Sequence, residues 1–152
     1  MFLFPKIKEF AKLAPQVTLS ISLHAANDET RNAIMPVNKM FDIKTLMDAC
    51  KYYIKETNRR ISFEYTLIAG VNDNINTADN LSRLLKGMLC HVNLIPVNAV
   101  SETGFKKTDK NQIEAFRLYL EKHKIPATVR REMGSDINAA CGQLRKNRLE
   151  GV

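Results

Sequence analysis

The chain has 152 residues, 45% of them hydrophobic and 26% charged, and its 23 Lys and Arg residues against 16 Asp and Glu residues give a formal net charge of +7. This length and composition are typical of one globular domain, and they exclude general disorder. A positive surface attracts phosphate backbones, but it also occurs on proteins that bind no nucleic acid. The charge therefore leaves RNA binding and a merely solvated surface both open.

Hydrophobic periodicity predicts helices and strands in alternation along the chain. The predicted helices cover residues 6–13, 28–34, 43–55, a segment from Thr77 or Asp79 to Gly87, and 111–123. The predicted strands cover residues 17–23, 60–68, 91–96 and 127–131. The segment after Gly134 is predicted to be mostly loop.

Short polar side chains mark the ends of several predicted elements. Asp42 and Asp109 are expected to cap helices, as is either Asn27 or Asp28, because their oxygens can accept backbone N–H groups of the first turn. The predicted turn formers after the second strand are Gly70, Asn72 and Asp73.

Strands that alternate with helices at these lengths predict an α/β fold with a parallel sheet. Four strands do not close a parallel barrel, so the sheet is either open and doubly wound or part of a barrel. Its first strand would have an unpaired edge, which favours association. The sequence contains no GxGxxG, GxxxxGK[ST] or GxSxG motif. Chemistry in such sheets gathers where strands end, which singles out Ser22, His24 and Asn98. Glu64, inside the second predicted strand, is interpreted as a paired residue of the barrel interior rather than a catalyst.

The three cysteines, Cys50, Cys90 and Cys141, lie far apart in the sequence and form no zinc-binding or disulfide pattern. Unpaired thiols indicate a reducing cytosol, so we expect a cytoplasmic protein. The sequence also has no leader-like start and no apolar run of about 20 residues, so we expect no membrane segment.

Three stretches of the chain carry a family resemblance. They are Ser20-Ile21-Ser22-Leu23-His24-Ala25-Ala26-Asn27-Asp28, then Asn93-Leu94-Ile95-Pro96-Val97-Asn98, and last Gly134-Ser135-Asp136-Ile137-Asn138-Ala139-Ala140-Cys141-Gly142-Gln143-Leu144. Together with the turn that follows the second strand, they resemble the radical-SAM adenine-C2 methyltransferases, which modify 23S rRNA and, in many members, tRNA. The resemblance extends over nearly the whole chain from about Pro5.

The resemblance implies a partial (βα)6 barrel, of which this chain would hold the last three strands and a C-terminal extension. Residues 1–125 would then form the half barrel, with residues 1–4 ending a further strand, and residues 126–152 would form the extension. It also implies methylation of the C2 carbon of adenine by a radical mechanism. The implied cofactors are S-adenosylmethionine and a 4Fe-4S cluster, and the implied partners are RNA and an electron donor for the cluster.

The resemblance assigns roles to five residues. Ser22, Leu23 and His24 would help to hold S-adenosylmethionine at the end of the first strand, and Asn98 would contact it after the third. Cys141 would carry the methyl group on its sulfur before the carbon passes to adenine. Considered without the family, a residue like His24 is more often a hydrogen-bonded structural histidine than a ligand, and one like Cys141 is usually a small buried hydrophobic residue.

The chain departs from the family pattern where the cluster should be held. It has no CxxxCxxC run, no Gly-Glu element and no second, resolving cysteine. Cys50 is predicted on an apolar helix face and Cys90 at the start of a strand, so neither is expected to replace the cluster ligands. We therefore predict that the isolated chain is inactive. Two alternatives remain open, a non-catalytic RNA-binding module derived from such an enzyme and an unrelated doubly wound protein with a small-molecule site.

Overall fold

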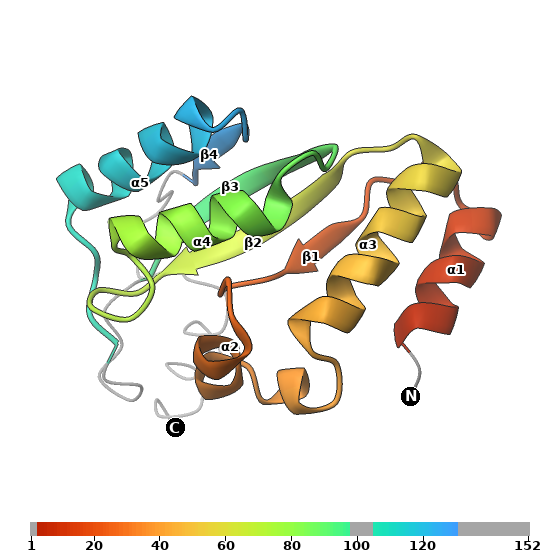
Figure 1. The fold of residues 1–152 in the computed structure, drawn as a ribbon, viewed down its shortest axis with the longest axis horizontal. Coiled ribbons are helices and arrows are strands. Elements are labelled where there is room, and N and C mark those ends of the chain that lie inside the picture. The colour runs from red at the N-terminus through yellow and green to blue at the C-terminus, as the bar shows by residue number, and fades with distance from the viewer. Residues whose placement is uncertain (1–2, 98–104, 131–152) are drawn as a thin grey trace, which may run out of the picture.

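The computed structural model describes residues 3–97 and 105–130, which form a four-stranded sheet with helices packed against it (Figure 1). Every helix and strand predicted within these ranges is present, although several boundaries move. The elements in chain order are α1 (Leu3–Leu13), β1 (Ser20–Ser22), α2 (Asp28–Ile34), the 3-10 helix η1 (Pro36–Lys39), α3 (Ile43–Thr57), β2 (Ile61–Leu67), α4 (Ile75–Leu85), β3 (Cys90–Pro96), α5 (Lys110–Lys122) and β4 (Ala127–Val129).

Side-chain caps fix the starts of four helices. The capping residues, whose side-chain oxygens accept a backbone N–H of the first turn, are Asn27, Asp42, Asn74 and Asp109. The predicted caps at Asp42 and Asp109 are confirmed, and Asn27 rather than Asp28 caps α2. The predicted start of α4 at Thr77 or Asp79 is wrong, because Asn74 accepts from Thr77 N at 2.9 Å and begins the helix at Ile75.

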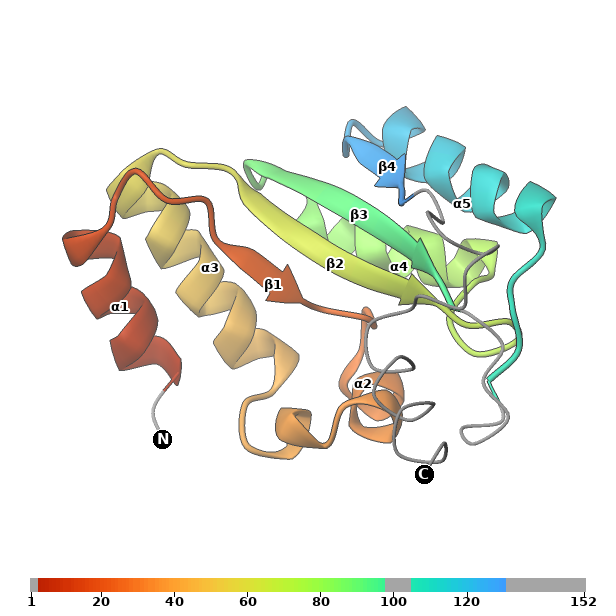
Figure 2. The same cartoon turned by 180° about the vertical axis from the view of Figure 1, so that it is seen from behind.

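The four strands are all parallel and lie in the order β1-β2-β3-β4. Helices α3 and α4 lie in front of the sheet in Figure 1 and behind it in Figure 2, with α1 packed on α3 and α5 on α4. In the described part of the chain, the long helices therefore cover a single face. A doubly wound sheet would have helices on both faces, whereas a barrel has them on the outside only, so the predicted partial barrel is confirmed and the doubly wound alternative is rejected.

The covered face of the sheet forms the core. Side chains alternate along β2, and Ile61, Phe63, Tyr65 and Leu67 are all fully buried while the residues between them are half-buried. Val92 and Leu94 continue the buried set on β3. The buried residues that α3, α4 and α5 pack against them include Tyr53, Ala78, Leu81, Leu85, Phe116 and Leu120.

Two predictions about strands are wrong in extent. The first strand was expected over residues 17–23, but only Ser20–Ser22 form β1, because this edge strand has one partner and its backbone bonds to β2 reach only from Leu19 to His24. Residues 3 and 4 belong to α1 rather than to the end of a further strand. Pro5 does not prevent this, since proline is tolerated in the first turn of a helix.

None of the helices in residues 3–97 and 105–130 is long and apolar enough to cross a membrane.

Candidate functional site at the strand ends

The segment Ser22-Leu23-His24 leaves the sheet at the carboxyl end of β1. Ser22 is paired with Glu64 of β2, and the backbone N–H groups of Leu23 and His24 both donate to the Glu64 carbonyl, at 3.0 and 3.3 Å. The segment therefore stays attached to β2 until His24, where the chain turns away toward α2 (Figure 1). This is the edge of the sheet where chemistry was expected.

His24 makes that turn in the left-handed conformation, with φ of 59°. This is an uncommon conformation for a residue with a Cβ atom, so it needs support from its surroundings. The ring supplies part of that support, because its Nδ1 accepts the backbone N–H of Thr66 at 3.1 Å. A neutral ring that accepts at Nδ1 carries its hydrogen on Nε2, which leaves an N–H donor for another group.

The surroundings also keep this ring uncharged. Burial lowers the pKa of His24, and the positive charge of Arg31 lowers it further, while the carboxylate of Glu64 opposes the shift. The Thr66 N–H adds to this effect, since a protonated Nδ1 could not accept it. The ring of His24 is thus a neutral hydrogen-bond donor near pH 7.

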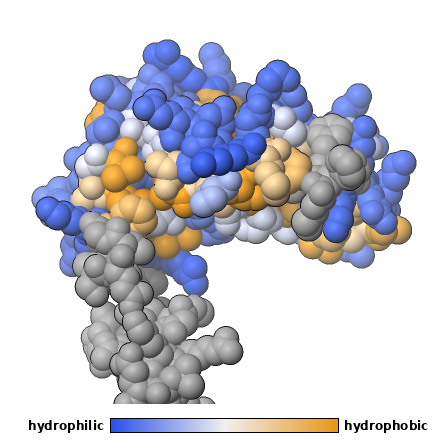
Figure 3. All heavy atoms as spheres, turned by 90° about the horizontal axis from the view of Figure 1, so that it is seen from below, coloured by the Kyte–Doolittle hydropathy of each residue, from blue (hydrophilic) through white to orange (hydrophobic). Residues whose placement is uncertain are grey.

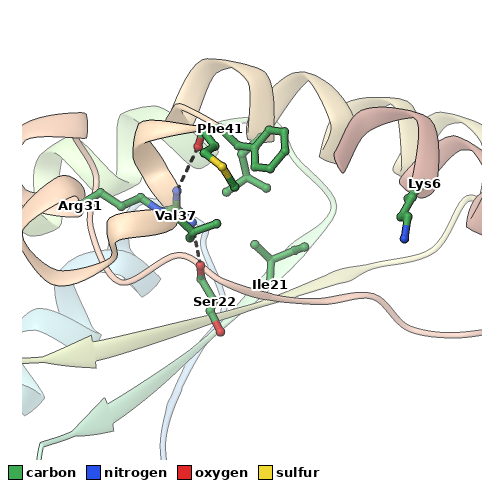
Figure 4. Close-up of a pocket in the computed structure, with 8 residues that line it drawn as sticks. Lys6, Ile21, Ser22, Arg31, Val37 and Phe41 are labelled. Carbon is green, nitrogen blue, oxygen red and sulfur yellow. Dashed lines mark hydrogen bonds between the residues drawn. The ribbon is translucent and has the colours of Figure 1, made fainter. Parts of the chain in front are cut away.

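Arg31 of α2 holds the backbone of the segment from one side. The residue is only 4% exposed, and its guanidinium donates from Nη2 to the Ser22 carbonyl at 3.1 Å and from Nε to the Leu23 carbonyl at 3.0 Å. Its Nη1 also donates to Oδ1 of Asn38. A further bond from Nη1, of 3.4 Å, reaches the carbonyl of Phe41 and is drawn in Figure 4. Three backbone carbonyls from two segments are therefore tied to one rigid cation.

Asn72, in the turn after β2, holds the segment from the other side. Its fully buried side chain donates from Nδ2 to the carbonyls of His24 and Thr66, at 2.8 and 2.7 Å, and accepts the N–H of Ile68 at 2.7 Å. The sequence identified Asn72 as a turn former. Its link to a residue 48 positions earlier in the chain was not predicted.

The five predicted site residues have different outcomes. Ser22 and His24 lie at the strand end, Ser22 exposed and His24 half-buried. Leu23 is fully buried in the core, and its N–H and carbonyl are bonded to Glu64 and Arg31, so its side chain does not face a ligand. Asn98 and Cys141 lie outside the described residues, and their roles stay predictions.

Figure 2 shows the face of the sheet that the described helices leave uncovered. Hydrogen-bonded polar side chains form a row across the strands on this face. We define this polar row as Ser20, Ser62, Glu64, Asn93 and Thr128. Glu64 Oε1 accepts from Ser20 at 3.2 Å and from Asn93 at 2.9 Å, and Asn93 also donates to Ser62 and accepts from Thr128, at 3.1 and 3.0 Å.

The polar row was only partly foreseen. Glu64 was interpreted as a paired residue of the barrel interior, and its pairing is confirmed. The other members went unnoticed, although the register Ser20↔Ser62, Ser22↔Glu64 and Glu64↔Asn93 brings their positions together. Polar residues at alternate positions in three neighbouring predicted strands were the available signal.

A cavity of about 270 Å³ lies beside the segment, between β1 and the loop that contains η1 (Figure 4). Most of its lining is apolar, from Ile21, Val37, Met40, Phe41 and Leu46, and the remaining lining residues are Lys6, Ser22 and Arg31. Met40 is 67% exposed, and Figure 3 shows apolar side chains gathered in a band on the face seen from below. This cavity has the character of a packing surface, unlike the polar row.

The two described cysteines are unsuited to hold a metal cluster. Both are buried, and burial raises the pKa of Cys50 to about 12 and that of Cys90 to about 11. An iron ligand must be a thiolate, which these sites disfavour. Within residues 3–97 and 105–130, no group of three His, Cys, Asp or Glu side chains could hold a metal ion.

Searches against known proteins found close relatives for nearly the whole chain, although no protein-family model matches it. The chain is 58% identical over 148 residues to a protein of Clostridium perfringens described as "Probable dual-specificity RNA methyltransferase RlmN". The aligned region covers 97% of this chain and 43% of the relative. Proteins with the same description from Lachnospira eligens and Caldanaerobacter subterraneus are 53% and 57% identical. The chain thus spans less than half the length of these relatives.

Solved structures agree with the sequence relatives. A radical SAM methyltransferase from Sphaerobacter thermophilus superposes with a TM-score of 0.87 at 48% identity, over 93% of this chain and 41% of that one. A domain of a pyruvate-formate lyase-activating enzyme from Bacteroides vulgatus superposes with a TM-score of 0.66 at 15% identity, which supports the fold alone.

Proposed function

Because this chain belongs to the family of radical-SAM RNA methyltransferases, we propose that it supplies part of the catalytic barrel of such an enzyme. The chain spans about 43% of the length of the curated relatives. The proposed reaction is methylation of the C2 carbon of adenine in 23S rRNA, and in tRNA where the dual specificity holds. The observation that carries the proposal is the identity of 53–58% over nearly the whole chain.

The strand-end segment is proposed to hold S-adenosylmethionine. The exposed Ser22 hydroxyl and the Nε2–H of His24 suit the amino, carboxylate and hydroxyl groups of such a ligand, and Asn98 is proposed to join them. Leu23 contributes by anchoring the segment, since its side chain is buried and its backbone is bonded to Glu64 and Arg31. When bound, S-adenosylmethionine supplies the methyl group and the radical chemistry that the unreactive C2 carbon requires.

Cys141 is proposed as the methyl carrier. A methyl carrier needs a sulfur that is reachable and can be deprotonated, and neither Cys50 nor Cys90 meets this need, because both are buried with raised pKa values. The described residues also do not fit the 4Fe-4S cluster. We therefore place its ligands, and the contact with its electron donor, in the part of the relatives that this chain does not span.

RNA is the proposed partner, and the cytoplasm the proposed setting. The net charge of +7 suits a phosphate backbone, and the relatives are described as RNA methyltransferases. The unpaired thiols of Cys50 and Cys90 fit a reducing compartment. The alternative function is a non-catalytic RNA-binding module, which would retain the charge without the chemistry.

A reconstitution experiment tests the proposal. The 152-residue chain is produced alone and fused to the remaining part of the Clostridium perfringens relative, and 2-methyladenosine in 23S rRNA is measured by mass spectrometry in cells that lack their own enzyme. The fusion should methylate, the isolated chain should not, and Cys141→Ala should abolish the product. Cys50→Ala is the matched control and should retain it. A fusion that binds RNA without methylating it would favour the binding module.

A second experiment tests the cofactor site itself. His24→Asn removes the ring while keeping a residue that tolerates the left-handed conformation, and His91→Asn makes the same change on β3. In the fusion protein, His24→Asn should weaken binding of S-adenosylmethionine about tenfold, as expected for one lost hydrogen bond. His91→Asn should change it less than twofold. Equal effects of the two changes would contradict the assignment of His24.

A further inference from the structure

Asn72 is fully buried in the turn after β2, and its side chain makes three hydrogen bonds beside the strand-end segment. Both hydrogens of its Nδ2 are donated to backbone carbonyls, of His24 at 2.8 Å and of Thr66 at 2.7 Å, and its Oδ1 accepts the N–H of Ile68 at 2.7 Å. These partners come from two segments far apart in sequence. A neutral amide is the one group of this size that can donate twice and accept once in this arrangement.

The hydrogen bonds of Asn72, Thr66 and His24 form a closed ring. Thr66 accepts from Asn72 through its carbonyl and donates through its N–H to Nδ1 of His24, while the His24 carbonyl accepts from the same Asn72 amide. The ring of His24 is thus fixed from the end of β2 and its carbonyl from the turn that follows β2. This support lies where the left-handed φ of 59° requires it.

We propose that Asn72 is a positioning residue, which fixes both the left-handed backbone of His24 and the acceptor role of its Nδ1, and so presents Nε2–H as a donor toward a polar ligand. Asn72 does not touch that ligand itself. The inference rests on the proposed function only for the identity of the ligand. The positioning is a property of the chain alone.

The charged groups that face His24 set the expected titration. Arg31 of α2 and Glu64 of β2 act on the ring in opposite directions, and burial lowers the pKa of His24 most strongly. If Asn72 is lost, the ring should leave Thr66 and become more accessible to water. Both changes raise the pKa of His24 toward its ordinary value of about 6.5.

A matched pair of variants tests the proposal without any ligand. Asn72→Asp places a carboxylate against two carbonyl oxygens, whereas Asn74→Asp makes the same change two residues later and preserves the cap of α4, because Asp caps helices as well as Asn. In Asn72→Asp, the Thr66 amide hydrogen should exchange at least tenfold faster and the pKa of His24 should rise. Both quantities, followed by NMR, should stay unchanged in Asn74→Asp.

Two results would overturn the proposal. One is a Thr66 amide that exchanges as slowly in Asn72→Asp as in the unmodified chain, even if the new carboxylate raises the pKa of His24. The other is the lack of a scalar coupling between the Thr66 N–H and His24 Nδ1 in the unmodified chain. This coupling can be measured even when Asn72→Asp does not fold. If positioning is confirmed but S-adenosylmethionine does not bind the fusion, the proposed function fails and this inference stands.

Discussion

The two faces of the parallel sheet are built from alternate residues of the same strands, yet they differ in what holds them. On the covered face, Phe63 and Tyr65 are fully buried under helices and contribute through apolar packing. On the opposite face, Glu64 and Asn93 are half-buried and bonded to one another in the polar row. Along one strand, alternate residues therefore stabilise the core by packing, and the residues between them form hydrogen bonds on the opposite face.

Approximate magnitudes show how unequal the two faces are in folding. Burial of one large apolar side chain stabilises the fold by about 1.5–3 kcal/mol, whereas one neutral hydrogen bond contributes about 1 kcal/mol net. The covered face thus dominates stability, and the polar face can be changed with little effect on it. The following predictions test this division, from the largest expected effect to the smallest.

The largest effect is expected for the reactivity of the two buried cysteines. With the pKa of Cys50 at about 12 and that of Cys90 at about 11, their thiolate fractions at pH 8 are lower than that of an ordinary thiol by roughly 10³-fold and 10²-fold. Alkylation by iodoacetamide, mapped by mass spectrometry, should spare both in the folded chain and label both in urea. Rapid labelling of Cys50 without urea would show that the covered face opens easily.

Phe63→Ala should destabilise the chain most among single substitutions of the sheet. Phe63 is fully buried within the core cluster, and truncation of a buried phenylalanine costs about 3–5 kcal/mol through lost contacts and the remaining cavity. Urea denaturation followed by circular dichroism measures the change. A loss below about 1 kcal/mol would mean that the helices pack less tightly on this face than the burial indicates.

Arg31→Met should have an intermediate effect. The change leaves the carbonyls of Ser22 and Leu23 without their donor, which costs about 1.5–3 kcal/mol. Lys44→Met is the matched control, because the pair between Lys44 and Asp48 is exposed to solvent and contributes little to stability. The same denaturation measurement compares them, and similar losses for both would contradict the role of Arg31.

Glu64→Gln should have the smallest effect. The amide keeps an oxygen that can accept from Ser20 and Asn93, so the polar row should persist with a change in unfolding free energy of less than about 1 kcal/mol. A loss of more than about 2 kcal/mol would show that the polar face shares in stability, and the division between the faces would then fail.

Local signals made parts of the fold predictable. The cap at Asp42 and the alternation of β2 depend on residues next to each other in sequence, so their helix and strand were placed closely. The length of β1 depends on its partner strand and was overestimated. The covering of one face by helices also depends on tertiary packing, and the sequence left the doubly wound alternative open.

The site was predictable to a similar extent. Ser22 and His24 were selected because they follow a strand in a parallel sheet and because the stretch around them resembles a known family. The supports of His24 were not selected, since Asn72 and Thr66 bond to it from 48 and 42 residues away. Arg31 was given no role because a charged residue in a short helix is usually exposed, whereas this one is buried.

The distance along the chain between Arg31 and its partners has a kinetic consequence. Arg31 contacts the carbonyls of Leu23, Ser22 and Phe41 across 8, 9 and 10 residues, so these contacts close only short loops. Asn72 reaches His24 across 48 residues and can do so only after β1 has paired with β2. We therefore expect the strand-end segment to form in two stages during folding, with the Arg31 side structured early and the His24 side completed late.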